Sequence, residues 1–313
     1  MKRVEYLLKL VFALVLGVLA LFAPSVFLKA ILSIVALILL ATNMRNYKIL
    51  FLILSIVLFI VPASFFSNYI SNRSFWRWIN SDNFFQSSNN GETLKPDTYI
   101  DAADNLIISG PGFRILFDET SDKIYIPHEI KQSRSGDTLS LSSNSVNKSA
   151  FIEVGTKSPY NSIRIEASGL SISGNLTVED MNIQTLGLSS YVDLQATNFI
   201  VNCAGLDLGG ELSVDNIEIN ATGVSWKGTV DAQKVKVQGI GMDINLLVKR
   251  AEDIVIQATA LNGSLKYLDE WAGTRNMSIY VTHGNFTLIE PSDNEGSLEL
   301  NISGMINVDR KKY

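Results

Sequence analysis

Few residues of this sequence could do chemistry. The chain of 313 residues has one cysteine, Cys203, and two histidines, His128 and His283. A single cysteine cannot form an intramolecular disulfide, and a thiolate zinc site would need more ligands than these scattered residues provide. We therefore interpret Cys203 as a small buried apolar residue, and we expect no metal ion and no cofactor.

Acidic residues in the second half of the chain are the remaining candidates for acid–base chemistry. They are Asp193, Asp207, Glu211, Asp215 and Asp231. A polysaccharide-cleaving site would need such groups to converge on one groove beside Lys or Arg. The spacing of these residues does not predict one column with a cation next to it. We expect a solvated outer face and no catalytic residue.

Known chemical motifs are missing from the sequence, which contains no HExxH, no GxSxG and no phosphate-binding glycine loop. Residues 209–216, GGELSVDN, match part of the element that calcium-binding solenoids repeat, but the match occurs only once in the sequence. The formal net charge of −5 provides no basic surface for phosphate groups. We therefore expect no nucleic-acid partner.

Apolar residues are concentrated at the N-terminus. The hydrophobic content is 47% and the charged content only 18%, and the excess lies in segments 6–23, 26–41 and 49–66. Each segment is about long enough to cross a hydrocarbon core near 30 Å thick as a helix. The sequence therefore predicts a transmembrane anchor of three α-helices over residues 1–67, with the lipid bilayer as its partner.

Positive charges predict the orientation of this anchor. Lys2 and Arg3 precede the first segment, and Arg45 and Lys48 separate the second from the third. If both basic ends are cytoplasmic, everything after the third span is extracytoplasmic. Residues 68–96 are then an interfacial segment and polar linker, in which three side chains are expected at headgroup level: Trp76, Arg77 and Trp78.

A glycine repeats at intervals of eighteen residues through the polar part of the chain. The repeated glycines are Gly169, Gly187, Gly205, Gly223 and Gly241. An apolar residue follows each glycine, and within each unit the apolar positions alternate, which is the period of a strand with one buried face. A unit this short cannot bury its apolar row alone, so the units are expected to stack.

Stacked units predict a single-chain parallel β-solenoid over residues 161–313, with about eighteen residues in each coil. The glycines are expected at corners where the backbone takes positive φ. The fifth unit gains one residue, which shifts its strand to 254–256. Residues 261–275 depart from the pattern, and we interpret them as a bulged loop or a short helix that is the first candidate for a functional loop. Residues 97–160 are expected to form antiparallel hairpins that cap the solenoid.

These segments resemble a known family. ISGPGFRILF, SDKIYIP and SGDTLSL, followed by glycine-punctuated coils, resemble the bacterial head-GIN and toast-rack β-solenoid domains, which are named as adhesins. The arrangement behind transmembrane segments is similar to the LiaF-like and PspC-like envelope-stress proteins. The resemblance runs from about residue 98 to the end of the sequence, and it implies a scaffold, adhesion or sensory role in the cell envelope without supplying any site residues.

The sequence thus predicts a non-enzymatic, multi-pass membrane protein with an extracytoplasmic solenoid that binds an envelope protein or a wall polymer. Two alternatives stay open. One is a sensor of envelope stress that regulates a membrane kinase, and the other is a polysaccharide-active solenoid enzyme. Self-assembly into a homo-oligomer through the solenoid ends also stays open, because stacked coils can pair where capping is incomplete.

Overall fold

The computed structural model describes residues 93–144 and 148–313. The chain divides into two compact units, Met1–Asn72 and Arg73–Tyr313, and every described residue belongs to the second. The three expected membrane helices, the interfacial residues Trp76, Arg77 and Trp78, and the linker up to residue 92 lie outside the described residues. In the part that is described, no helix could cross a bilayer.

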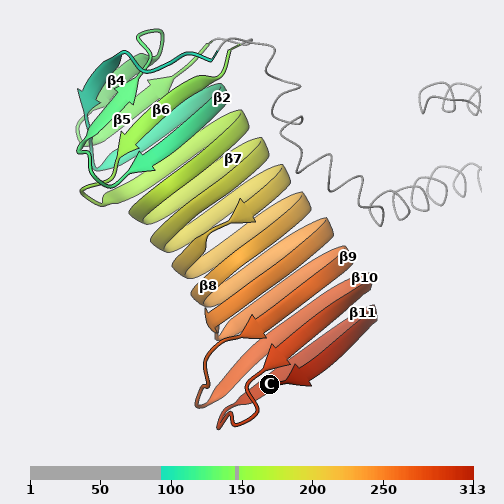
Figure 1. The fold of residues 1–313 in the computed structure, drawn as a ribbon. Helices are drawn as coiled ribbons and strands as arrows, with labels where there is room; N and C mark the ends of the chain where they lie inside the picture. The colour runs from blue at the N-terminus through green and yellow to red at the C-terminus, as the bar shows by residue number, and fades with distance from the viewer. Residues whose placement is uncertain (1–92, 145–147) are drawn as a thin grey trace, which may run out of the picture. The chain divides into compact units, whose positions relative to one another are not determined.

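The described residues are all-β, as the alternating apolar pattern predicts. The N-terminal strands are β1 (Thr98–Asp101), β2 (Asn105–Asp118), β3 (Lys123–Ile126), β4 (Lys131–Ser135), β5 (Thr138–Ser142) and β6 (Ala150–Gly155). The solenoid continues through β7 (Tyr160–Gly209), β8 (Glu211–Arg250), β9 (Asp253–Tyr267), β10 (Thr274–Glu290) and β11 (Ser297–Lys312). Figure 1 shows β7 and β8 winding through successive stacked coils, with β9, β10 and β11 continuing the stack.

Parallel pairing between coils confirms the eighteen-residue repeat. Phe199 pairs with Ile217 and Val201 with Ile219 where β7 meets β8. The offset becomes nineteen where β8 meets β9, because Val235 pairs with Ile254. The extra residue predicted for the fifth unit is therefore real, and its strand is shifted as expected.

The corner glycines lie in register but not in the expected conformation. Gly205 pairs with Gly223, and the residue before each glycine is skipped by the ladder, which marks a corner. None of the five repeated glycines has positive φ, so that explanation of the repeat is wrong. A Cβ atom at Gly169 or at Gly205 would meet no atom within 4 Å.

Glycine is required at a different corner of the coil. Gly174 and Gly210 have φ of 101° and 94°, in the left-handed region that L-residues with a side chain avoid. A Cβ at Gly210 would lie 2.4 Å from the carbonyl oxygen of Val192 in the preceding coil. These glycines therefore allow both the turn and the close approach of two coils.

The core is a set of columns that run through the stacked coils. In one column every member is at most 3% exposed: Leu106, Ile163, Met181, Phe199, Ile217, Val235, Ile254 and Met277. Ladder pairs place neighbouring members of this column opposite one another, for example Leu106 and Ile163. Burial of like residues on adjacent coils, in this column and the others, supplies the apolar driving force for stacking.

The N-terminal region is only partly antiparallel. β1 pairs with β3, β3 with β6 and β4 with β5 in the expected antiparallel sense. β2, however, pairs in parallel with β5, β6 and β7. The expectation of a hairpin for the segments of β2 is therefore wrong, and parallel coil pairing already begins at Asn105.

Candidate functional site

One outer face of the solenoid carries an open polar groove. Its floor is formed by outward side chains of residues 175–179, 193–197 and 211–215, which lie on successive coils. Two hollows, of about 270 and 420 Å³, open on this face. Both hollows are lined by Thr177, Gln195 and Ser213, so we treat them as one feature and call it the polar groove.

The strand period explains why this floor is polar. Leu176, Leu194 and Leu212 point into the core and are at most 3% exposed. Residues on either side of each leucine point outward, because successive side chains of a strand alternate between faces. The same alternation that builds the core therefore sets out a regular array of polar groups on the outside.

The central stripe of the polar groove has no partner within the protein. Thr177, Gln195 and Ser213 are exposed, and in the described part of the chain their side chains make no hydrogen bond or ion pair. Each of these groups can both donate and accept hydrogen bonds. Their hydrogen-bonding capacity is therefore available to a ligand.

Outward side chains elsewhere on the solenoid are paired across coils. Asn216 donates to Asn198 at 3.1 Å, and Asn198 donates to Asp180 at 2.7 Å. Asn220 donates to Asn202 at 3.1 Å in a second ladder. Such ladders pair some of the polar groups on those faces, whereas the three side chains of the central stripe occupy one column on successive coils without pairing.

The N-terminal side of the polar groove is closed by residues of the loops that connect the first strands. The amide of Asn175 donates to a carboxylate oxygen of Glu119 at 2.9 Å. The hydroxyl of Thr156 donates to the carbonyl oxygen of Asn175 at 2.9 Å. Tyr160 is 3% exposed and donates to the carbonyl oxygen of Gly155 at 2.9 Å, which fixes this wall.

Two consecutive cations at the end of β8, Lys249 and Arg250, reach back to acidic residues of earlier coils. The Nζ atom of Lys249 lies 2.5 Å from a carboxylate oxygen of Glu211, which is 38 residues earlier. Arg250 contacts Asp231 at 2.9 Å and Asp215 at 3.7 Å. The hydrogen bond and charge of Glu211 raise the pKa of Lys249. These exposed pairs add little stability on their own, but the two cations partly neutralise the negative charge of the groove.

Four of the five carboxylates considered from the sequence therefore gather near this face. Asp193 accepts a hydrogen bond from the backbone N–H of Glu211 at 2.8 Å, and Asp231 and Asp215 share Arg250. Cations do lie beside three of these acids, as ion pairs with two consecutive residues and not as one repeated column. Glu211 lies 38 residues before Lys249, and Asp231 lies 19 residues before Arg250, so these pairs are not evident from local spacing. Asp207 lies apart and accepts from the hydroxyl of Tyr191 at 2.8 Å.

The remaining candidates for chemistry do not gather into a site. Cys203 is partly buried, and burial raises the pKa of its thiol to about 12, which suppresses the reactive thiolate. His128 pairs with Asp97 in an exposed turn, and His283 lies within β10. Among the described residues, no group of three His, Cys, Asp or Glu side chains could hold a metal ion.

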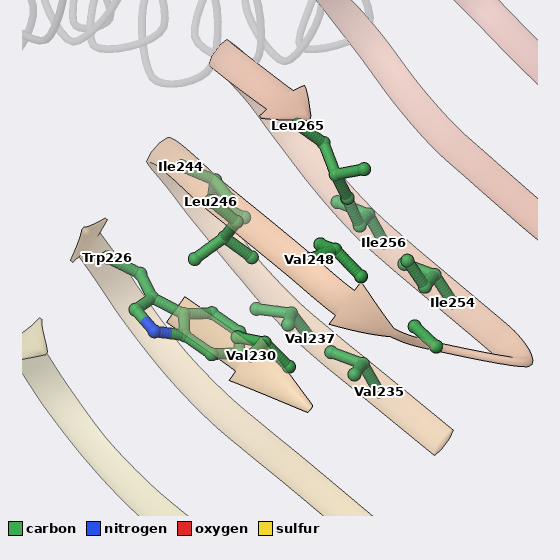
Figure 2. Close-up of a pocket in the computed structure, with 11 residues that line it drawn as sticks. Trp226, Val230, Val235, Val237, Ile244, Leu246, Val248, Ile254, Ile256 and Leu265 are labelled. Atoms are coloured by element: carbon green, nitrogen blue, oxygen red, sulfur yellow. The ribbon is translucent and has the colours of Figure 1, made fainter. Parts of the chain in front are cut away.

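Another hollow is enclosed in the core and is a packing defect. Figure 2 shows Trp226 facing apolar side chains of the neighbouring coils, among them Val237 and Leu246. The void measures about 10 Å³, which is at the lower limit for one water molecule and far below the size of an organic ligand. The indole N–H of Trp226 has no hydrogen-bond partner.

The loop that sequence reasoning favoured is a structural element. Residues 261–267 stay in β9, in register with 242–248, and only 268–273 leave the strand. Trp271 is 7% exposed and packs on Tyr267 with ring centroids 4.9 Å apart. The guanidinium of Arg275 lies 4.4 Å from the Trp271 ring. Within this loop Trp271 covers the core of the last coils, while Asp269, Glu270, Ala272 and Gly273 are exposed.

Comparisons with known proteins return structures of low similarity. No protein-family model and no curated protein matches the sequence. A putative adhesin from Bacteroides fragilis has 16% identity and a TM-score of 0.37, covering 70% of this chain and 99% of its own. A putative adhesin from Parabacteroides distasonis has 12% identity and a TM-score of 0.36, covering 71% and 100%. A putative lipid binding protein from the same species has 15% identity and a TM-score of 0.32, again covering 71% and 100%. Similarity at this level says nothing about what this chain binds.

Proposed function

We propose that this chain is a membrane-anchored, extracytoplasmic interaction module of the cell envelope that binds its partner in the polar groove without chemical conversion. The observation that carries the proposal is the central stripe of Thr177, Gln195 and Ser213. These side chains are exposed and unpaired, whereas polar ladders elsewhere on the solenoid are satisfied internally. An unpaired polar array on a rigid ladder is preorganised for binding.

The anchor and the orientation in this proposal come from the sequence. Three apolar segments within residues 1–67 are long enough to span a bilayer. Basic residues flank the ends expected on the cytoplasmic side, so the solenoid that follows would face outward. A rigid stack of coils is suited to holding a binding surface away from a membrane.

A polysaccharide-active enzyme is the second candidate, because carboxylates and cations do meet in one groove. Those carboxylates are engaged, however: Glu211 with Lys249, and Asp215 with Arg250. A binding role needs no free acid–base pair, and it accounts for the unpaired stripe directly. Glycan cleavage that is abolished by Glu211→Gln and spared by Glu299→Gln would favour the enzyme over the binding module.

The test of the proposal is photo-crosslinking in intact cells. A photoreactive amino acid replaces Gln195 in the polar groove, and in a control protein it replaces Gln184, which is exposed on another face of the same strand. We expect an adduct of higher mass at position 195 and none at position 184. Equal adducts at the two positions, or none at either, would contradict the assignment of the groove as the binding surface.

A further inference from the structure

The polar groove also indicates which chemical class of partner it takes, and this inference rests on the proposed function. We propose that the groove binds a segment of a polysaccharide chain that is neutral or carries amino groups, and that it rejects anionic polymers. Three properties of the groove carry this assignment: its openness, the chemistry of its floor and the sign of its charge.

The dimensions favour a chain over a small apolar molecule. The two hollows of about 270 and 420 Å³ share their central residues and are open to solvent. Sites for small organic ligands are enclosed and mostly lined by apolar and aromatic side chains. Here the outward positions of the floor carry hydroxyl, amide and carboxylate groups, so a ligand must be recognised by hydrogen bonds along its length.

The floor matches the hydroxyl groups of sugars. Thr177, Gln195 and Ser213 both donate and accept, as sugar hydroxyls do. The stripe repeats at the spacing of adjacent strands, about 4.8 Å, so a polymer with a regular repeat can make the same contact on successive coils. Many weak contacts of this kind add up along a chain.

A peptide partner is less well matched. Peptides that bind β-structures usually add a strand to an open sheet edge or insert apolar side chains into pockets. The floor of the polar groove lies on a sheet face, where the backbone groups of the coils already pair with one another. Its inward leucines are buried and offer no apolar pocket to a side chain.

The charge of the polar groove selects among polysaccharides. Five carboxylates line the two hollows: Glu119, Glu179, Asp193, Glu211 and Asp215. Arg250 is the single cation of this lining, and Lys249 at the rim adds one more through its pair with Glu211. The excess of negative charge repels uronic-acid or phosphate polymers and attracts ammonium groups on amino sugars.

The experiment measures binding of defined hexasaccharides to the full chain in detergent micelles by calorimetry and saturation-transfer NMR. The probes are β-1,4-linked oligomers of glucose, of N-acetylglucosamine and of glucosamine, with a galacturonate hexamer as the anionic probe and hexalysine as a cationic peptide. The groove variant combines Thr177→Ala, Gln195→Ala and Ser213→Ala. The matched control combines Gln184→Ala and Thr222→Ala, which are exposed positions away from the groove.

We expect at least one of the three neutral or amino hexasaccharides to bind and the galacturonate hexamer not to bind. The groove variant should weaken binding at least about ten-fold, since each lost hydrogen bond contributes a few-fold, and the control should leave it unchanged. Absence of binding by all three hexasaccharides would overturn the inference, as would binding that the groove variant does not weaken. If hexalysine alone binds, the partner is a cationic peptide and the glycan assignment is wrong.

The two proposals can fail separately. A protein adduct at position 195 in intact cells, together with no binding of any hexasaccharide, would leave the interaction module standing and remove only its glycan ligand. Glycan binding in vitro without an adduct at position 195 in cells would contradict the proposed function and leave the chemistry of the groove intact.

Discussion

Replacing Trp226 with Ala should destabilise the middle of the solenoid. Trp226 is fully buried and pairs across the ladder with Leu208. Truncation of a buried aromatic residue to Ala costs about 3–5 kcal/mol. The coils are held about 4.8 Å apart by backbone hydrogen bonds and cannot collapse onto the space, so the packing loss should lie in the upper part of that range.

The unpaired indole N–H offsets part of this loss. A buried donor without an acceptor costs about 1–3 kcal/mol, and the variant removes it. The net loss in free energy of unfolding is therefore expected to be about 1–4 kcal/mol. Trp226→Phe removes the same donor while keeping an aromatic ring, so its loss should be about 1 kcal/mol or less.

Urea unfolding of the unit Arg73–Tyr313 measures these values, and hydrogen exchange locates the effect. Because the backbone ladders and the core columns join each coil to its neighbours, faster exchange should be confined to strands near β8. Lys227→Ala is the control, since Lys227 is the exposed neighbour of Trp226 on the same strand. If Trp226→Ala and Lys227→Ala lose the same free energy of unfolding, the reasoning about the packed columns is refuted.

Three further predictions concern glycine, pH and a buried charge. Gly210→Ala should lower the free energy of unfolding by about 1–3 kcal/mol because of the positive φ of Gly210. Gly205→Ala should be neutral, because a Cβ at Gly205 meets no atom within 4 Å. Urea unfolding that ranks the two variants in the reverse order would contradict this prediction. Asp97 raises the pKa of His128 above 6.5, so their pair stabilises the fold below pH 6.5 and loses that contribution as the pH rises through the folded-state pKa. His128→Gln should therefore reduce the fall in Tm between about pH 5.5 and 8. An unchanged dependence of Tm on pH would contradict a stabilising role for the pair of His128 and Asp97. Arg275 is 8% exposed, its Nη1 atom has no hydrogen-bond partner, and burial lowers its pKa. Arg275→Met should keep or raise Tm, because it removes a buried unpaired charge while preserving packing. A marked fall in Tm would show that the stacking of the guanidinium on the aromatic rings dominates.

Much of the fold could be predicted from the sequence because inward positions obey a simple period. Phe199, Ile217 and Val235 recur in one column, and such a column specifies both the strand and its register. The same regular column reveals the one-residue insertion before Ile254, because the next apolar position is shifted by one residue. The conformation of the corners could not be predicted, since glycine at a corner does not reveal whether φ is positive. Gly205 and Gly210 differ in this respect although both lie in turns of one coil.

The candidate site was harder to predict because it depends on which side chains remain unpaired. Asn198 and Gln195 look equivalent in the sequence, as polar outward residues of one coil. Only the three-dimensional register shows that Asn198 joins a ladder and Gln195 does not. The contact of Lys249 with Glu211, 38 residues earlier, likewise depends on the three-dimensional register and not on local spacing.

The presence of a glycine between two large apolar residues, Ile244 and Phe286, was also unpredictable. Gly263 pairs with Ile244 on one side and with Phe286 on the other. A Cβ at Gly263 would lie 1.9 Å from the carbonyl oxygen of Ile244. The close approach of these coils explains the glycine, but no local pattern in the sequence indicates it.

The most direct test of the account is whether the polar groove faces outward from the cell. Gln195→Cys introduces an exposed thiol, and the native Cys203 serves as an internal control because burial raises its pKa to about 12. Spheroplasts are treated with a membrane-impermeant maleimide, with the unmodified protein and permeabilised cells alongside. We expect the variant to be labelled in sealed spheroplasts and the unmodified protein to stay unlabelled. Labelling of the variant only after permeabilisation would place the groove in the cytoplasm and contradict the account.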